Sequence, residues 1–227
     1  MNCEIYDLGL TGYQDALHIQ RQLHRYKCFC QIYDFLLVLE HPAVITLGRN
    51  ADLNNVLVDA EFLKRHNVEI VESDRGGDVT FHLPGQLIAY PIFDLKERGK
   101  NIKLFLHGLE EVIIRFLSFF NIGAQRVQGM RGVWAGNKKI GSIGIGISKW
   151  VSYHGLSINV NCDLGLLSWI KPCGLEAVDF TSLSRILGKD LSCSEVKGVL
   201  LDAFSTVFGL EYQKSYQQSA AEQLILA

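Results

Sequence analysis

The glycine-rich stretch at 74–86 constrains the fold most, because it lies between two apolar runs, 68–71 and 87–95. Apolar runs bounded by turn residues predict buried strands, so the stretch itself is expected to form a loop and a short strand. Glycine lacks a Cβ and tolerates positive φ, which lets the backbone approach a ligand closely. Arg75 and His82 add hydrogen-bond donors there. Two interpretations stay open for this stretch alone: a turn with incidental polar residues, or a ligand-binding loop.

Composition places the 227-residue chain among ordinary globular proteins, with 48% hydrophobic and 20% charged residues. Without a repeat, a low-complexity block or a linker, one domain over residues 1–227 is the simplest expectation. A net charge of −2 gives no general basic field, so neither nucleic acid nor an anionic membrane is expected as the main partner. No window reaches the apolar length of about 20 residues that a membrane span needs. The first residues lack a secretory or transit signal, which predicts a cytoplasmic protein.

The cysteines show no spacing typical of a disulfide framework, and most are expected to be reduced, buried hydrophobic residues. They stand at positions 3, 28, 30, 162, 173 and 193. His24, Cys28 and Cys30 can be drawn as metal ligands, but no fourth ligand accompanies them. We therefore expect no metal and no cofactor.

The helix at 102–120 is the clearest element, because Asn101 can cap it and apolar residues recur at steps of three and four. Pro91 places the strand at 87–95 at a sheet edge or at a bend. The tail at 211–227 is expected to be polar and then weakly helical. Further helices are expected near 13–25, 60–66, 181–187 and 195–208, and further strands near 35–39, 44–49 and 150–160.

A strict alternation from Ser142 to Ser148 predicts a strand with isoleucines on one face and only glycine and serine on the other. A face without bulky side chains leaves a trough. Either another element of the fold or a slender ligand, such as an acyl chain, is expected to fill it.

Cys173 lies in a tight turn between Pro172 and Gly174, where a thiol is expected to be accessible. A thiol with its usual pKa is mostly protonated at neutral pH, so a nucleophilic cysteine needs a cation or a proton acceptor beside it. Lys139, His82 or His154 can serve. From the residues alone, an inert loop cysteine remains the alternative.

Several ordered motifs together resemble the lipoyl(octanoyl) transferases over roughly residues 35 to 190. An early region with Glu40-His41-Pro42 and Thr46-Leu47-Gly48-Arg49 fits the same pattern. The motifs are Arg75-Gly76-Gly77-x-x-Thr80-Phe81-His82-x-Pro84-Gly85-Gln86, Lys139-Ile140-x-Ser142-Ile143-Gly144-Ile145, His154-Gly155-Leu156-Ser157-x-Asn159-x-x-x-Asp163-Leu164 and Pro172-Cys173-Gly174.

This resemblance implies an α+β fold of the biotin/lipoate protein ligase catalytic type, with a mixed central sheet flanked by helices. It also implies an acyltransferase that moves an octanoyl group from octanoyl-acyl carrier protein to a lysine of a lipoyl domain, the first step of protein lipoylation. The acceptors would be the E2 subunits of 2-oxoacid dehydrogenases and the glycine cleavage H protein.

Carried over to this sequence, the resemblance makes Cys173 the nucleophile that forms an acyl-thioester. Lys139 lowers the pKa of that thiol and transfers protons; alignment with the following motif favours it over Lys138. Leu83 stands where the family usually has glycine, and we expect it to reshape the acyl channel. The implied acyl-binding wall comprises Arg75, Gly76, Gly77, Asp78, Val79, Thr80, Phe81, His82, Ser142, Ile143, Gly144, Gly155, Leu156 and Ser157.

Two other functions stay open. An ATP-dependent lipoate or biotin ligase of the same fold would activate its acid as an adenylate and would not need Cys173. A catalytically idle acyl-binding protein would retain the pocket alone. Covalent acylation without ATP distinguishes the transferase from both alternatives.

Overall fold

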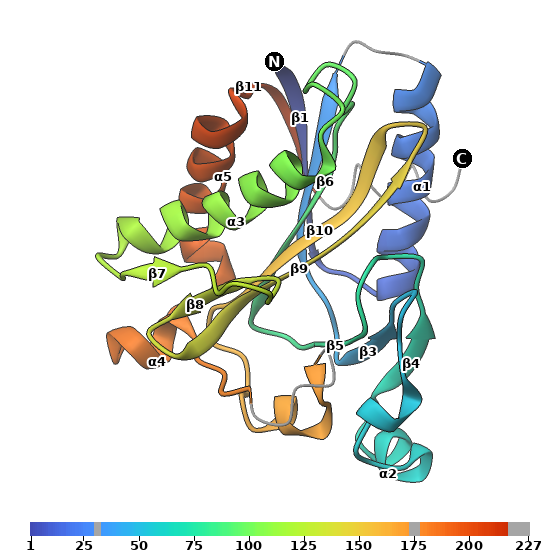
Figure 1. Ribbon diagram of the computed structural model, residues 1–227, viewed down its shortest axis with the longest axis vertical. Helices are drawn as coiled ribbons and strands as arrows, with labels where there is room; N and C mark the ends of the chain where they lie inside the picture. Colours follow the sequence, from blue (N-terminus) through green and yellow to red (C-terminus); the bar gives the residue numbers. More distant parts are fainter. Residues whose placement is uncertain (30–32, 173–177, 218–227) are drawn as a thin grey trace.

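The computed structural model describes residues 1–29, 33–172 and 178–217. Its main sheet has eight strands in the order β11-β1-β2-β6-β10-β9-β8-β7, and a smaller sheet has the order β4-β3-β5 (Figure 1). Parallel and antiparallel pairs occur in both sheets, which confirms the expected mixed α+β architecture. The strands are β1 (Asn2–Leu10), β2 (Asp34–Glu40), β3 (Val44–Leu47), β4 (Glu69–Glu72), β5 (Val79–His82), β6 (Gln86–Ile92), β7 (Ala124–Gln125), β8 (Val133–Ala135), β9 (Lys138–Ser148), β10 (Val151–Asn159) and β11 (Glu211–Gln217).

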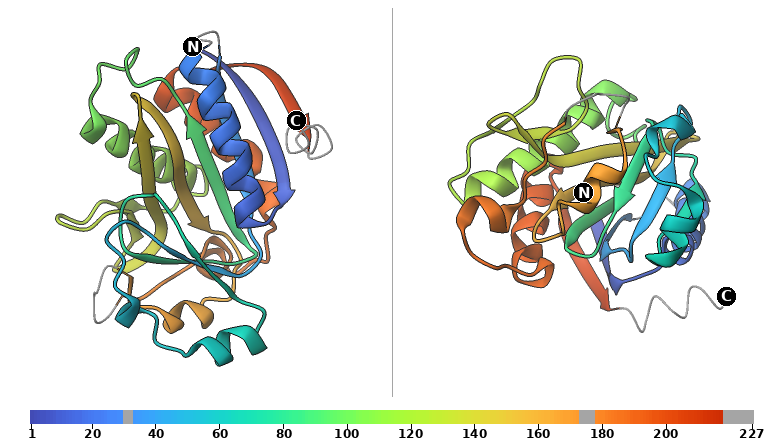
Figure 2. Two further views of the ribbon diagram at one scale, coloured as in Figure 1. Left: turned by 90° about the vertical axis from the view of Figure 1, so that its right-hand side faces the viewer. Right: turned by 90° about the horizontal axis from the view of Figure 1, so that it is seen from below.

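Helices cover both faces of the main sheet (Figures 1 and 2). On one face, α3 (Ile102–Phe119) and α5 (Cys193–Phe208) pack together and share a core cluster with strands of the sheet. On the other face, α1 (Tyr13–Phe29) packs on β2, β6 and β10. Shorter elements are α2 (Ala60–Arg65), α4 (Leu183–Leu187) and the 3-10 turns η1 (Leu53–Asn55) and η2 (Leu166–Trp169).

Most helix ends lie within two residues of the predicted ones, but α1 continues to Phe29 instead of ending near residue 25. The Asn101 side chain accepts a hydrogen bond from the backbone N–H of Leu104 at 2.9 Å, which caps α3. Ser192 and Glu195 form a reciprocal capping box at the start of α5, and Gly209 ends it with a φ of 61°. Local side-chain chemistry therefore fixes these boundaries.

Pro91 does not place its strand at an edge of the sheet, because β6 lies between β2 and β10. The ladder from β6 to β10 covers only residues 86–89 and 156–159, so it has ended before Pro91. Beyond that point the Ser152 hydroxyl donates to the carbonyl of Pro91 at 2.7 Å and accepts from the N–H of Phe93 at 3.0 Å. Of the two expectations, an edge strand or a bend, the edge strand was wrong; inside the sheet the Ser152 side chain takes over the hydrogen bonds where the ladder to β10 ends.

The first and last strands, β1 and β11, were not predicted from the sequence. The β11 strand occupies residues 211–217, for which a polar and then helical tail was expected, and it pairs in parallel with β1. The rings of Tyr6 and Tyr216 stack with centroids 4.8 Å apart. Pairing between residues about 210 positions apart leaves no local signal of helix or strand. The rest of the expected tail, 218–227, lies outside the described residues.

No helix in the described ranges is both long enough and apolar enough to cross a membrane. The expectation of one domain over the whole chain stays a prediction.

Candidate active site

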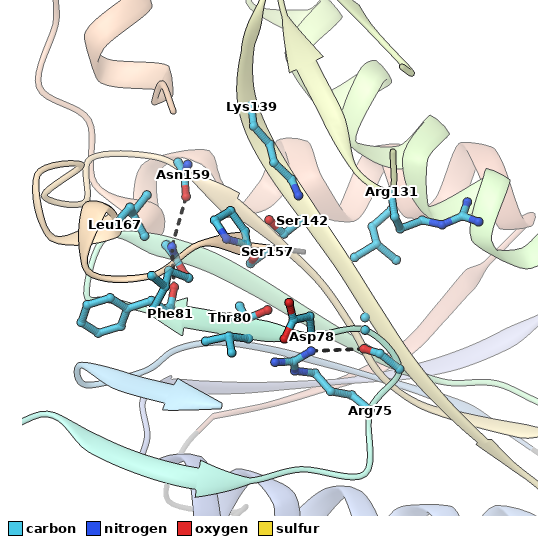
Figure 3. Close-up of a pocket in the computed structure, with 18 of the residues that line it drawn as sticks. Arg75, Asp78, Thr80, Phe81, Arg131, Lys139, Ser142, Ser157, Asn159 and Leu167 are labelled. Carbon is cyan, nitrogen blue, oxygen red and sulfur yellow. Dashed lines mark hydrogen bonds between the residues drawn. The ribbon is translucent and has the colours of Figure 1, made fainter. Parts of the chain in front are cut away.

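A cavity of about 260 Å³ lies between β5, β9, β10 and the residues Leu167, Ile170, Pro172 and Phe180 (Figure 3). Apolar side chains make up much of its wall, while a few polar groups converge on it, as is usual for a small-molecule site. It is lined by Arg75, Gly76, Gly77, Asp78, Val79, Thr80, Phe81, Gln86, Leu106, Arg131, Lys139, Ser142, Ile143, Gly144, Ile145, Ser157, Asn159, Leu167, Ile170, Pro172 and Phe180.

A second, much smaller compartment adjoins the first and contains the remaining members of the expected acyl-binding wall. Its volume is about 20 Å³, and His82, Gly155 and Leu156 line it together with residues that the two spaces share. The fold thus brings every expected wall residue to one of two adjoining spaces. That these residues bind an acyl chain stays a prediction.

Lys139 lines the main cavity and is only 7% exposed. Its Nζ lies 5.4 Å from the centre of the Trp134 ring, a cation–π contact. Figure 3 shows the side chain pointing from β9 toward the hydroxyls of Ser142 and Ser157. Lys138 points elsewhere: its side chain is 41% exposed and lies 4.0 Å from the carboxylate of Asp179. Lys139 therefore faces the cavity and Lys138 does not; the catalytic role of Lys139 stays a prediction.

Backbone hydrogen bonds join Lys139 to the segment that follows Cys173. The N–H of Lys139 donates to the carbonyl of Asp179 at 2.8 Å, and the N–H of Thr181 donates to the carbonyl of Lys139 at 2.9 Å. Pro172 lines the same cavity as Lys139. Cys173 itself lies outside the described residues, so its role as nucleophile stays a prediction.

Three other cysteines are buried, as expected for most of them: Cys3, Cys162 and Cys193 are at most 6% exposed. Burial raises the pKa of the Cys162 thiol to about 12 and also raises the pKa of Cys3 and Cys193. These thiols stay protonated at neutral pH, which makes them poor nucleophiles.

Among the described residues no group of three or more potential metal ligands occurs; Cys30 of the alternative metal set is not described.

Arg75 is buried and serves the fold as well as the cavity wall. Its Nε and Nη2 donate to the Thr46 hydroxyl at 3.0 and 2.8 Å, and Nη2 also donates to the Thr46 carbonyl at 2.7 Å. A Cβ on Gly48 would come within 2.3 Å of the Gly77 carbonyl oxygen. The close approach of this loop therefore explains the glycine at position 48, whereas Gly77 has a φ of 91°, a backbone conformation that favours glycine.

Asp78 holds the glycine-rich loop in place just before β5 begins. Its carboxylate accepts from the N–H of Asp52 at 3.0 Å and from the side-chain amide of Asn55 at 2.6 Å. The carbonyl of Asn55 in turn accepts from the N–H of Lys171 at 2.7 Å. Asp78 thus connects the glycine-rich loop, through η1, to the segment that leads to Cys173.

Two polar residues of the cavity, Gln86 and Asn159, were not named as site residues from the sequence. The Gln86 amide accepts from His82 Nδ1 at 3.1 Å and donates to the Asn159 side chain at 3.1 Å. Asn159 then donates to the carbonyl of Thr181 at 3.0 Å, and the N–H of the same Thr181 donates to the carbonyl of Lys139. Both residues stand inside the sequence motifs, which was the available signal. Leu106, Arg131, Ile145, Leu167, Ile170, Pro172 and Phe180 also line the cavity and were not named either.

The buried histidines are neutral. Burial lowers the pKa of His82 well below 6.5 and lowers that of His154 as well. The Nε2 of His154 lies 2.9 Å from the Asp74 carboxylate, and Asp74 has a pKa of about 2, chiefly because it accepts this hydrogen bond. His82 and His154 line the small compartment, whereas Lys139 lines the main cavity beside Pro172. Which of these groups assists the thiol of Cys173 stays a prediction.

The glycine and serine face of β9 is filled in part by protein. A Cβ on Gly146 would lie 2.3 Å from the Tyr153 ring, and one on Gly144 would lie 3.2 Å from Arg75. Ser142 and Gly144 nevertheless line both spaces. The two interpretations of the trough thus apply to different ends of the same strand.

Leu83 does not reshape the cavity as expected from its place in the motif. It is 1% exposed and packs in a cluster with Ile45, Leu63 and Phe81. Among the described lining residues of the two spaces, Leu83 does not occur. The expectation was wrong because its side chain points into the core behind β5.

The fold is that of the lipoate and biotin protein ligases. A lipoate-protein ligase A bound with ATP superposes with a TM-score of 0.80 at 18% identity, covering 100% of this chain and 93% of that one. The biotin protein ligase of Aquifex aeolicus in complex with biotin and ATP gives a TM-score of 0.55 at 17% identity, over 91% and 70% of the two chains. At these identities the likeness establishes the fold class alone.

Comparison with known sequences identifies the family within this fold class. Residues 12–205 match the family described as Lipoyl protein ligase A/B catalytic domain. The octanoyltransferase of Caldicellulosiruptor bescii is 46% identical over 219 residues, which cover 96% of this chain and 94% of that protein. The chain belongs to the octanoyltransferases, a family of acyltransferases with the ligase fold.

Proposed function

We propose that this protein transfers an octanoyl group from octanoyl-acyl carrier protein to a lysine of lipoyl domains, in the cytoplasm, as the first step of protein lipoylation. The observation that carries the proposal is the buried Lys139, which lines a largely apolar cavity together with Pro172, the residue before Cys173. The 46% identity to an octanoyltransferase over nearly the whole chain supports it. Acceptors are the E2 subunits of 2-oxoacid dehydrogenases and the glycine cleavage H protein.

In the first step, the thiolate of Cys173 attacks the thioester carbonyl of the octanoyl carrier. A new carbon–sulfur bond forms, the bond to the carrier sulfur breaks, and the carrier thiolate takes a proton from the Lys139 ammonium, which leaves a neutral amine. The ammonium of Lys139 stabilises the attacking thiolate. One thioester replaces another, so the step is close to thermoneutral and needs no ATP.

In the second step, the amine of the acceptor lysine attacks the acyl-enzyme, and the bond to Cys173 breaks. The neutral amine of Lys139 accepts the proton that the acceptor nitrogen loses. An amide replaces a thioester, which makes the overall transfer downhill. The wall residues at 75–82, 142–144 and 155–157 hold the acyl chain away from water during both steps.

An ATP-dependent ligase is the main competing function. The likeness to ligases rests on identities of 18% and 17%, whereas the likeness to an octanoyltransferase is 46%. A ligase also has no use for a cysteine beside Pro172. An idle acyl-binding protein would not need a lysine buried next to that segment.

The test is the intact mass of the protein after incubation with octanoyl-acyl carrier protein without ATP. We expect an octanoyl adduct that hydroxylamine removes, and no adduct on Cys173→Ala. Lys139→Ala should slow adduct formation by about a hundredfold or more, as removal of a general acid–base does. Lys138→Ala is the matched control and should react like the wild type. A wild type without adduct, with lipoyl domains modified only from free acid and ATP, would establish the ligase instead.

A further inference from the structure

A third cavity lies apart from the two spaces of the candidate active site, between α1 and the edge of the main sheet formed by β11, β1 and β2. Its volume of about 470 Å³ is within the range of about 300–1,000 Å³ that small-molecule sites occupy. None of its described lining residues lines either of the other two spaces. We call it the aromatic pocket, because its wall includes five aromatic rings and one carboxylate: Tyr6, Tyr26, Tyr33, Phe35, Tyr216 and Glu4.

The rings come from distant parts of the chain and are inclined to one another. The Phe35 ring meets those of Tyr6 and Tyr26 at 66° and 62°, with centroids 6.2 and 5.9 Å apart. The Tyr216 ring stacks on that of Tyr6. Inclined rings form a concave wall and turn their faces in different directions. The faces of aromatic rings are electron-rich and attract cations.

Glu4 adds a negative charge to this wall. Its side chain lies in the pocket wall and is only 8% exposed, and the Tyr6 hydroxyl donates to its carboxylate at 3.5 Å. None of the ion pairs among the side chains that the structure describes includes Glu4. A carboxylate is costly to bury without a compensating positive charge. A cation in the pocket would therefore be stabilised by both the carboxylate and the rings.

The same wall disfavours other classes of ligand. An anion would meet the charge of Glu4 and the negative faces of the rings, and the described lining residues include no lysine or arginine. A neutral apolar ligand would cover the carboxylate without neutralising it. A cation with alkyl groups on its nitrogen satisfies both parts of the wall, because its charge lies near the carboxylate while its alkyl groups contact the rings.

We propose that the aromatic pocket binds a small quaternary ammonium cation, with the charge beside Glu4 and the N-methyl groups against the aromatic rings. Because the pocket joins β1, β11 and α1, the bound cation stabilises the folded chain. The inference does not depend on the proposed acyl transfer, since the two sites share no described lining residue.

The test compares choline with 3,3-dimethylbutan-1-ol, which has the same shape but carries carbon in place of the charged nitrogen. Binding of each to the full chain is measured by isothermal titration calorimetry and by the shift of the thermal midpoint. We expect choline to bind at least about tenfold more tightly than the alcohol. Choline should also raise the thermal midpoint as its concentration increases.

Two variants change the wall separately. Glu4→Gln keeps the size of the side chain and removes its charge, so choline should bind about tenfold more weakly while the alcohol binds as before. Tyr216→Leu removes one ring but keeps an apolar side chain, and should also weaken choline binding. Glu69→Gln, at an exposed position of β4 in the smaller sheet, is the matched control and should bind choline like the wild type. Urea denaturation shows whether each variant is folded.

Three results would overturn the inference. The first is equal affinity of the wild type for choline and the alcohol, or no heat of binding up to about 50 mM choline. The second is unchanged choline affinity in both Glu4→Gln and Tyr216→Leu. The third concerns Lys214, which stands opposite Glu4 in the register of β1 and β11. Choline that binds to Lys214→Met but not to the wild type would assign the carboxylate to this lysine instead. None of these results bears on acyl transfer, which the adduct on Cys173 tests separately.

Discussion

Leu83 shows how a residue next to the site can belong wholly to the core. Its side chain is 1% exposed and packs with Ile45, Leu63 and Phe81 under β5. We expect Leu83→Ala to lower the free energy of unfolding by about 3 kcal/mol, because truncation leaves a cavity in a packed cluster. The acyl-length preference should not change. Urea denaturation and the ratio of acylation rates from decanoyl- and octanoyl-acyl carrier protein measure the two effects separately.

The control for Leu83 is Leu53→Ala. Leu53 is 66% exposed, so its truncation should change the free energy of unfolding by less than about 0.5 kcal/mol. A changed acyl-length preference in Leu83→Ala with unchanged stability would contradict this assignment and return Leu83 to the channel wall.

On the scale of elements, the hydrogen bonds of Asp78 join the glycine-rich loop to η1. A carboxylate accepts from both Asp52 and Asn55, whereas an amide can accept from only one of them. We expect Asp78→Asn to cost about 1 kcal/mol and to slow acylation, because Asn55 also holds Lys171 near Cys173. Initial rates of acyl-enzyme formation and amide hydrogen exchange of η1 measure the two effects.

A reciprocal swap distinguishes a hydrogen-bond effect from a general effect of lost charge. In the double variant Asp78→Asn with Asn55→Asp, the new amide donates to the new carboxylate and still accepts from the N–H of Asp52. Protection of η1 and the acylation rate should recover. If the double variant is as slow as Asp78→Asn alone, the carboxylate of Asp78 has another role, such as contact with substrate.

The β6 and β10 strands show why Pro91 is tolerated inside the sheet. Opposite Pro91, β10 departs from β6: His154 has a φ of 54°, and its N–H donates to the Gln20 side chain at 2.7 Å instead of to a ladder partner. A Cβ on Gly155 would lie 2.2 Å from the Ala89 carbonyl oxygen. One local departure thus accommodates the proline and places His154 beside the small compartment.

On the scale of the whole molecule, three buried histidines from distant parts of the chain join its two sheets and α1. His41 follows β2, His82 ends β5, and His154 lies in β10; the ring of Tyr13 on α1 lies within 6.5 Å of all three. His41 donates from Nδ1 to the carbonyl of Thr11 at 2.6 Å and accepts from the Tyr90 hydroxyl at 2.9 Å. The cluster is stable in the neutral form.

Protonation of this cluster should destabilise the fold. Burial lowers the pKa of His41 to about 4, while an unfolded histidine titrates near 6.5. Between these values the unfolded chain binds more protons, so stability falls as the pH falls. His41 alone contributes at most about 1.4 kcal/mol per pH unit in this window. Asp74, with a pKa of about 2, contributes stability that is lost only below about pH 4.

Urea midpoints between pH 4.5 and 7.5 measure this dependence. We expect His41→Gln to reduce the slope of stability against pH, whatever it does to stability at pH 7.5. His18→Gln, at an exposed position of α1, should leave the slope as in the wild type. Equal slopes in the wild type and in His41→Gln would show that the pKa of His41 is the same in the folded and unfolded states.

Much of the secondary structure and the membership of the site could be read from the sequence, because both depend on local signals. Apolar periodicity and caps determine α3 and α5, and period-two alternation determines β9. The motifs contain most of the residues that line both spaces, but they do not contain Leu106, Arg131, Leu167, Ile170, Phe180, Tyr13 or Tyr90. The resemblance to a known family depends on the order of these motifs along the chain, because no single motif is specific enough.

Only the tertiary structure decided what depends on contacts between distant segments. The sequence could not give the pairing of β1 with β11, the interior place of Pro91 or the packing of Leu83 behind β5, because strand register and sheet order carry almost no local signal. The same holds for the site: Lys138 and Lys139 are adjacent and chemically alike. The alternation of a strand, seen against a folded core, buries one of them in the cavity and leaves the other at the surface.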